Sequence, residues 1–193
     1  MKIRLIALFL LLFILAGCGT QEPAASQPSQ QGKPLSYTGL GGEMPEMSYN
    51  LVDGETVSLY QLLEEKKLVV LNFWYEDCPW CVREFPIMEV AQQNYREDVQ
   101  FIALNPADDA DSIRAFRKDH SLTIPMATCS GSLPRQMGVG AYPTSIFIDR
   151  DGVVCLIHAG AILSTEDWYA VFDAFTAEDY QRQVYNRIEE LLG

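Results

Sequence analysis

Two cysteines, Cys78 and Cys81, flank the dipeptide Pro79-Trp80 and form a C-x-x-C motif. Such a motif can be half of a zinc site, a haem-attachment site or a redox-active dithiol. Covalent haem attachment needs a histidine directly after the second cysteine, where this chain has Val82. Because the motif follows an apolar run that predicts a buried strand, the redox pair is the favoured interpretation.

The expected position of the motif at the start of a helix indicates which cysteine is the nucleophile. Cys78 precedes the helix, and Pro79 suits its first position. The unpaired N–H groups and the helix dipole at this end favour a thiolate. Cys81 follows one turn later, which returns its sulfur to the side of Cys78. We expect Cys78, on the exposed end, to attack a substrate disulfide and Cys81 to resolve the mixed disulfide.

A buried Cys81 needs a group that accepts its proton, and Glu84 lies one further turn along the same helix. A carboxyl group in an apolar setting has a raised pKa and can act as a general base near neutral pH. The alternative is that Glu84 is a solvated helix residue with no part in the reaction.

Strands and helices alternate along the chain, which predicts an α/β fold. The longest β-branched and aromatic run, residues 68–74, predicts a central buried strand directly before the cysteines. Asp-Gly turns at residues 53–54 and 151–152 predict an N-terminal hairpin and a closing hairpin, and the second makes the central sheet mixed. We expect strands at 47–51, 56–57, 68–74, 99–104, 122–128, 144–149 and 153–158, and helices at 59–65, 79–94, 108–119, 133–137, 164–175 and 176–192.

The composition allows one globular core and limits the partners. The chain has 193 residues, of which 48% are apolar, and it carries 14 basic and 26 acidic side chains for a net charge of −12. Nucleic-acid binding and docking to anionic lipid headgroups need clustered basic side chains, so this charge argues against both. We expect a monomeric domain over residues 44–193.

The residues around the motif resemble the thioredoxin superfamily and, within it, the TlpA/ResA-like membrane-tethered thiol–disulfide oxidoreductases. This resemblance implies a thioredoxin-like fold in which the Cys78–Cys81 disulfide is the redox group and no other cofactor is needed. It also implies that Glu84 is the family's buried acidic residue. The resemblance covers about residues 44–175 and rests on the segments 51–59, 72–74, 78–81, 84–86 and 142–149.

The same resemblance implies a substrate-binding surface beside the cysteines. Tyr142 and Pro143 match the family's cis-proline loop, whose backbone receives the substrate peptide. Trp80 is expected at the exposed rim, where it would shape access to the dithiol. We therefore expect Trp80, Tyr142 and Pro143 to contact the substrate.

Two positions depart from the family pattern. Asp77 stands before the first cysteine, where the family usually has tryptophan, and its negative charge should raise the pKa of Cys78. The Pro79-Trp80 dipeptide is similar to those of more oxidising relatives. Both departures leave the direction of electron flow open, because thiolate stability helps to set the reduction potential.

The first residues resemble a bacterial lipoprotein signal. A basic start precedes an apolar run, residues 5–16, that is too short for a comfortable transmembrane helix. Cys18 follows Leu-Ala-Gly as in the lipoprotein box, which implies lipidation at Cys18 after removal of residues 1–17. A plain signal peptide is the alternative. Residues 18–43 predict a flexible tether, so we expect an extracytoplasmic protein anchored to the bacterial cell membrane by its lipid.

The remaining possible metal ligands stand singly along the chain, as Cys129, Cys155, His120 and His158, so we expect no metal site. Cys155 lies in an apolar run and favours a small buried residue. Cys129 lies at the end of a predicted strand, and the sequence leaves open whether it serves as an accessory thiol. The expected strand order puts these two cysteines on opposite sides of the sheet, which argues against a disulfide between them.

Several functions remain in competition. The favoured one is a reductase for disulfides in exported proteins, by resemblance including apocytochrome c, that draws electrons from a membrane thiol carrier. A disulfide-donating oxidase of the same fold is the alternative direction. A peroxiredoxin-type peroxidase would need Thr or Ser near its reactive cysteine, and residues 74–85 contain neither. A non-catalytic lipoprotein that holds a metal, a haem or a partner stays open.

Overall fold

The computed structural model describes residues 39–178 and residue 180. The predicted signal peptide, the lipidation site Cys18, most of the tether and nearly all of the last predicted helix lie outside this part. Within it, no helix is long and apolar enough to cross a membrane. The elements follow in the order β1 (Ser48–Asn50), β2 (Thr56–Ser58), α1 (Leu59–Glu65), β3 (Leu68–Phe73), α2 (Pro79–Tyr95), β4 (Val99–Asn105), α3 (Ala110–Asp119), β5 (Met126–Thr128), α4 (Leu133–Gln136), β6 (Thr144–Asp149), β7 (Val154–Ala159) and α5 (Thr165–Thr176).

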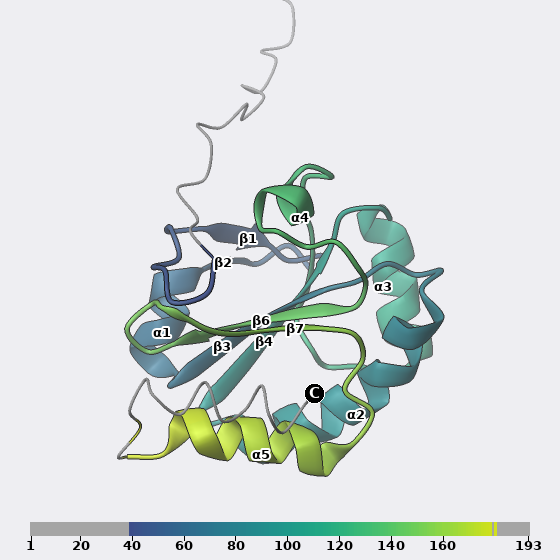
Figure 1. Ribbon diagram of the computed structural model, residues 1–193. Helices are drawn as coiled ribbons and strands as arrows, with labels where there is room; N and C mark the ends of the chain where they lie inside the picture. The colour runs from purple at the N-terminus through teal and green to yellow at the C-terminus, as the bar shows by residue number, and fades with distance from the viewer. Residues whose placement is uncertain (1–38, 179, 181–193) are drawn as a thin grey trace, which may run out of the picture. The chain divides into compact units, whose positions relative to one another are not determined.

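In the described residues the strands form one mixed sheet and one hairpin. The five-stranded sheet has the order β5-β4-β3-β6-β7 (Figure 1). β3, β4 and β5 run parallel, whereas β6 and β7 are antiparallel to their neighbours. β1 and β2 pair separately as an antiparallel hairpin. The predicted α/β class, mixed sheet and N-terminal hairpin are confirmed.

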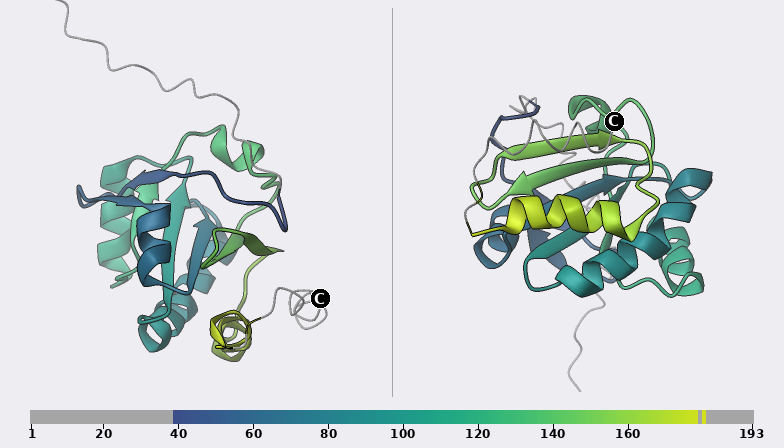
Figure 2. Two further views of the ribbon diagram at one scale, coloured as in Figure 1. Left: turned by 90° about the vertical axis from the view of Figure 1, so that its left-hand side faces the viewer. Right: turned by 60° about the horizontal axis from the view of Figure 1, so that its bottom comes forward.

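The strand β3 lies at the centre of the sheet, and every one of its side chains is buried. The two parallel crossovers, β3-α2-β4 and β4-α3-β5, move in the same direction across the sheet, so right-handed connections place α2 and α3 on one face. The helix α5 packs beside α2 on this face (Figure 2). Residues from α1, α4 and β1 form the hydrophobic cluster on the opposite face.

The residues on either side of β1 join the two edges of the sheet. The Gly41 N–H donates to the carbonyl of Val154 in β7 at 2.8 Å, and the Val52 N–H donates to the carbonyl of Met126 in β5 at 2.9 Å. The hydrogen-bonded part of the chain therefore extends upstream of Met44, and the hairpin covers the β5 edge of the sheet.

One predicted strand, residues 122–128, is wrong at its beginning, because β5 starts only at Met126. The two N–H groups before Pro125 donate to the carboxylate of Glu89 at 2.8 and 3.2 Å instead of joining a strand. Pro125 itself has no N–H to donate. The other described elements begin and end within about two residues of their predicted bounds.

Candidate active site

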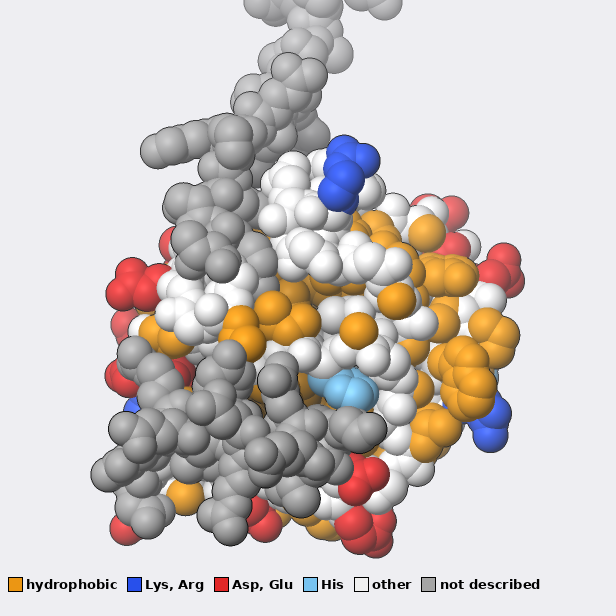
Figure 3. All heavy atoms as spheres, viewed as in Figure 1, with side chains coloured by type: hydrophobic (Ala, Val, Ile, Leu, Met, Phe, Trp, Pro, Cys, Tyr) orange, Lys and Arg blue, Asp and Glu red, His pale blue; other side chains and the backbone are white. Residues whose placement is uncertain are grey.

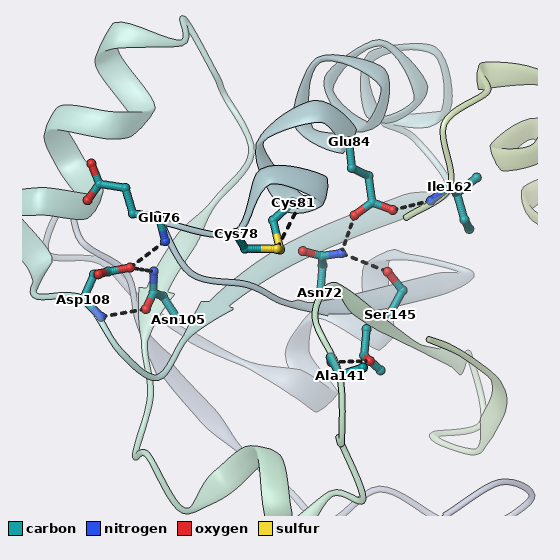
Figure 4. The surroundings of a disulfide bond; sticks show 11 residues. Asn72, Glu76, Cys78, Cys81, Glu84, Asn105, Asp108, Ala141, Ser145 and Ile162 are labelled. Atoms are coloured by element: carbon teal, nitrogen blue, oxygen red, sulfur yellow. Dashed lines mark hydrogen bonds between the residues drawn. A yellow bond between two sulfur atoms is a disulfide. The ribbon is translucent and has the colours of Figure 1, made fainter. Parts of the chain in front are cut away.

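Cys78 and Cys81 are joined by a disulfide at the N-terminus of α2 (Figure 4). Cys78 is the N-cap of the helix, and its sulfur accepts a hydrogen bond from the Cys81 N–H at 3.2 Å. Pro79 occupies the first turn, as the sequence predicts. When the disulfide opens, the same N–H group and the helix dipole are placed to stabilise a thiolate on Cys78. The geometry therefore supports Cys78 as the nucleophile.

Both cysteines are covered in the disulfide state. Cys78 is 3% exposed and Cys81 is 1% exposed, so the expectation that Cys78 lies on an exposed end is wrong for this state. The physical reason is packing, since Cys78 belongs to the same hydrophobic cluster as Trp74 and Phe85. The sulfur of a substrate can therefore approach Cys78 only through the small part of the Cys78 surface that is exposed.

Glu84 is fully buried beneath the first turns of α2, so the alternative of a solvated helix residue is wrong. Its Oε1 accepts a hydrogen bond from the Ile162 N–H at 2.8 Å, and its Oε2 accepts one from Asn72 Nδ2 at 3.2 Å. Burial raises the pKa of Glu84 to about 7, although both hydrogen bonds act to lower it. A carboxyl group with this pKa can gain or lose a proton near neutral pH, which suits a general base.

Asn72 is a site residue that sequence reasoning missed. It lies in the central strand β3 and is 1% exposed. Its Nδ2 donates to Glu84 and also to Ser145 Oγ at 3.0 Å, whereas its Oδ1 has no hydrogen-bond partner among the described residues. A polar residue inside an apolar strand, six positions before the first cysteine, is the signal in the sequence that could have pointed to it.

A second polar group fixes the loop that leads from β3 to the cysteines. The Asp108 carboxylate accepts a hydrogen bond from the Glu76 N–H at 2.8 Å and another from Asn105 Nδ2 at 2.8 Å (Figure 4). Asn105 Oδ1 in turn accepts from the Asp108 N–H at 2.8 Å. Asp108 therefore ties the loop before Cys78 to the end of β4. The sequence pattern gave no sign of this role.

Replacing Asp108 with alanine should lower the free energy of unfolding by about 1–2 kcal/mol, because hydrogen bonds to a charged acceptor are lost from a partly buried loop. Urea denaturation of the disulfide form checks this value. Glu76→Ala is the matched control, since Glu76 takes part through its backbone N–H, which the substitution keeps. Equal losses in the two variants would contradict the assignment of the anchor to Asp108.

The predicted cis-proline loop lies beside the loop that carries the cysteines. The Tyr142-Pro143 peptide bond is cis, as the resemblance implies. The next residue, Thr144, pairs with Phe73 at the end of β3. The Tyr142 ring also contacts the Tyr75 ring in an edge-to-face arrangement, with 5.3 Å between the ring centres. The structure thus places the proposed substrate-binding backbone next to the residues that precede Cys78.

Trp80 is 52% exposed, in agreement with its predicted place at the rim. The Arg83 guanidinium lies over its ring, 4.8 Å from the ring centre. Figure 3 shows hydrophobic side chains gathered where α2 begins, next to a basic side chain. An apolar rim at this place can pack against a substrate protein.

The other two described cysteines stay apart from the disulfide. Cys129 and Cys155 are both free, and they belong to opposite edges of the sheet, as expected. Cys155 is buried within β7. Burial raises the pKa of Cys129 to about 12, so its thiol stays protonated near neutral pH. These environments do not favour a second reactive thiol.

Comparison with known proteins gives matches over most of this region. Residues 40–170 match the family model described as Redoxin. The chain is 32% identical over 129 residues to the thioredoxin-like protein YneN of Bacillus subtilis, which covers 65% of this chain and 75% of YneN. It is 33% identical over 113 residues to the thiol-disulfide oxidoreductase ResA of Halalkalibacterium halodurans, which covers 58% of this chain and 63% of ResA, less than two thirds of that relative.

The fold also matches solved structures. One, from Chlorobium tepidum, is proposed to be a thiol:disulfide interchange protein of the DsbE type. It superposes with a TM-score of 0.59 and 29% sequence identity, over 68% of this chain and 92% of that chain. The likeness supports the predicted thioredoxin-like arrangement of sheet and helices.

Proposed function

Because the chain belongs to the Redoxin family, we propose that it reduces disulfides in exported proteins, as a membrane-tethered enzyme outside the cytoplasm. It is a thiol–disulfide oxidoreductase of the TlpA/ResA-like group in the thioredoxin superfamily. The observation that carries the proposal is the Cys78–Cys81 disulfide at a helix N-terminus, one turn before a buried glutamate.

The reaction begins with the dithiol form of the protein. The Cys78 thiolate attacks a substrate disulfide, which forms a mixed disulfide and releases one substrate sulfur as a thiolate that takes up a proton. Glu84 then accepts the proton of the Cys81 thiol. The Cys81 thiolate attacks the Cys78 sulfur, which releases the second substrate thiol and restores the Cys78–Cys81 disulfide. Two electrons pass from the protein to the substrate.

The finer parts of the proposal come from the sequence. The signal-like residues 1–17, the lipoprotein box at Cys18 and the tether over residues 18–43 support attachment to the membrane by lipid. A membrane thiol carrier would return the disulfide to the dithiol form. Apocytochrome c, whose haem-binding cysteines must be reduced, is the candidate substrate that the family resemblance supplies. Trp80, Tyr142 and Pro143 would contact the substrate.

The alternative direction, donation of a disulfide, is favoured by the Pro79-Trp80 dipeptide, which is similar to those of more oxidising relatives. Asp77 acts the other way, because it is exposed directly before Cys78 and a negative charge there disfavours the thiolate, which destabilises the reduced form. A non-catalytic metal carrier finds less support. Across residues 39–178 and 180, no group of three or more His, Cys, Asp or Glu side chains could hold a metal ion.

The reduction potential of the disulfide separates these functions. We would titrate the full chain in defined thiol buffers and follow the fluorescence of Trp74 and Trp80, with the Cys78→Ser variant as the control for an unrelated signal. We expect about −250 mV or lower, as for a reductase. A value near about −120 mV would assign the protein as a disulfide donor. The absence of a reversible two-electron transition would contradict oxidoreductase activity altogether.

A further inference from the structure

The buried carboxamide of Asn72 is only half satisfied in the disulfide state. Both donors of its nitrogen are used, one by Glu84 and one by Ser145. Its oxygen, Oδ1, has no partner among the described residues, although the side chain is almost fully buried. A buried acceptor without a donor is unfavourable, so an unpaired oxygen at the centre of a sheet calls for a physical reason.

The position of Asn72 in the strand and the orientation of its amide turn this oxygen toward the reacting sulfurs. Side chains alternate along β3, and Val70 and Trp74 belong to the hydrophobic cluster on the face that α2 covers. Asn72 lies between them in this alternation and therefore faces α2 as well. In Figure 4 the amide nitrogen of Asn72 turns toward Glu84 and Ser145, whereas the oxygen turns toward the Cys78–Cys81 disulfide.

The orientation of the amide is fixed by its partners. When Glu84 is ionised, rotating the carboxamide by half a turn would bring its oxygen against the Glu84 carboxylate oxygen and would remove that hydrogen bond. The oxygen is therefore held on the side of the sulfurs by two hydrogen bonds made at the other end of the same group.

Reduction of the disulfide supplies the missing donor. When a partner dithiol is oxidised to its disulfide, two electrons and two protons convert the bond between the two sulfurs into two thiols. A disulfide has no S–H group, whereas the Cys81 thiol has one. The acceptor on Asn72 is thus unpaired in the disulfide state, and reduction creates an S–H donor on the side toward which this acceptor turns.

We propose that Asn72 is a positioning residue that distinguishes the two redox states, with Oδ1 accepting a hydrogen bond from the reduced Cys81 thiol while Nδ2 holds the Glu84 carboxylate. The proposal rests on the oxidoreductase function given above and deepens it. One carboxamide then joins the resolving sulfur to its proton acceptor. It stabilises the dithiol relative to the disulfide and orients Glu84 for proton transfer.

The hydrogen-bond donors to Glu84 come from two parts of the chain. β3 contributes the Asn72 amide, and the loop after β7 contributes the Ile162 N–H. Among the described residues, the causes that set the pKa of Glu84 are burial and these two hydrogen bonds, and none is a neighbouring charge. Loss of the Asn72 donor should therefore raise the pKa of Glu84 further.

The test compares Asn72→Leu, which keeps the branched shape and removes both polar atoms, with the unchanged full chain. Equilibration with dithiothreitol buffers should show an equilibrium constant for reduction about tenfold lower in the variant, which is about 30 mV more negative for a two-electron couple. The pH midpoint for resolution of the mixed disulfide should also move upward. Ser145→Ala is the matched control, since it removes the other hydrogen-bond partner of the Asn72 nitrogen and leaves the contact with Glu84 in place.

Unchanged equilibrium constant and pH midpoint in Asn72→Leu would overturn the proposal, as would equal changes in Ser145→Ala. If the leucine variant does not fold, Asn72→Thr takes its place, and we expect it to change the equilibrium constant for reduction and the pH midpoint in the same directions. Its β-branched side chain suits a central strand, but its single hydroxyl cannot reach both neighbours. A reversible transition in the unchanged chain with no effect at Asn72 refutes this inference alone, whereas the absence of that transition refutes the proposed function.

Discussion

Replacing Cys81 with serine should leave the protein able to attack a substrate disulfide and unable to release it. Cys78 keeps its place at the helix N-terminus, where the N–H groups stabilise its thiolate. The mixed disulfide then accumulates, because a serine hydroxyl cannot displace the substrate sulfur. A non-reducing gel or intact-mass measurement should show about one substrate bound per protein.

The companion variant Cys78→Ser should form no such complex. Its turnover should fall by about a thousandfold or more, since a serine hydroxyl is not ionised near neutral pH and is a poor nucleophile toward sulfur. Cys129→Ser is the control, because Cys129 is a free cysteine whose pKa is raised by burial. Equal trapping by Cys78→Ser and Cys81→Ser, or loss of trapping in Cys129→Ser, would disprove the assigned order of attack.

The central part of the site could be predicted because local sequence determines it. An apolar run followed by Cys78 predicts a buried strand that leads into a helix, and β3 and α2 follow that pattern closely. The spacing of Cys81 and Glu84 by one turn then places both on one side of the helix. Burial of Glu84 could be suspected from the resemblance, and the structure confirms it.

Contacts between residues far apart in the chain were beyond prediction. Asp108 anchors the active-site loop at Glu76, thirty-two positions earlier, and no local pattern announces such a contact. Glu89 likewise holds the segment before Pro125 through two N–H groups, which is why the predicted strand there is too long. Hydrogen bonds of this kind depend on the complete fold.

The burial of Cys78 also results from contacts between residues that are far apart in the chain. A residue at a helix N-terminus is often accessible, and the sequence favoured exposure for this reason. In the folded chain Cys78 packs into the hydrophobic cluster that also holds Trp74. Exposure depends on which elements meet around a residue, and one sequence does not specify this. A substrate that reaches Cys78 must therefore make contacts at the rim before sulfur exchange can occur.

Replacing Glu84 with glutamine should change how stability depends on pH. In the folded protein the carboxyl group keeps its proton up to a pKa of about 7, whereas in the unfolded chain it ionises near its ordinary pKa of 4.5. The folded state binds more protons between these values, so the free energy of unfolding falls as the pH rises through this window. The contribution is fully present below about pH 4.5 and amounts to about 3 kcal/mol.

Urea denaturation of the disulfide form at a series of pH values measures this dependence. Relative to Glu84→Gln, the unchanged chain should lose about 3 kcal/mol between about pH 4.5 and 7, because glutamine has no proton to lose. Glu64→Gln, which alters an exposed glutamate of α1, should show no such difference. Parallel pH curves for the unchanged chain and Glu84→Gln would show that Glu84 does not titrate in this window.

The same substitution should slow the chemical step. Glutamine cannot accept the Cys81 proton, so resolution of the mixed disulfide should slow by about 10²–10⁴-fold, the usual contribution of a general base. The rise of the resolution rate toward pH 7 should also disappear, because it reports ionisation of Glu84. Rapid mixing of the preformed mixed disulfide separates this step from the initial attack by Cys78. A variant that resolves slowly but keeps the rise would assign the proton transfer to another group.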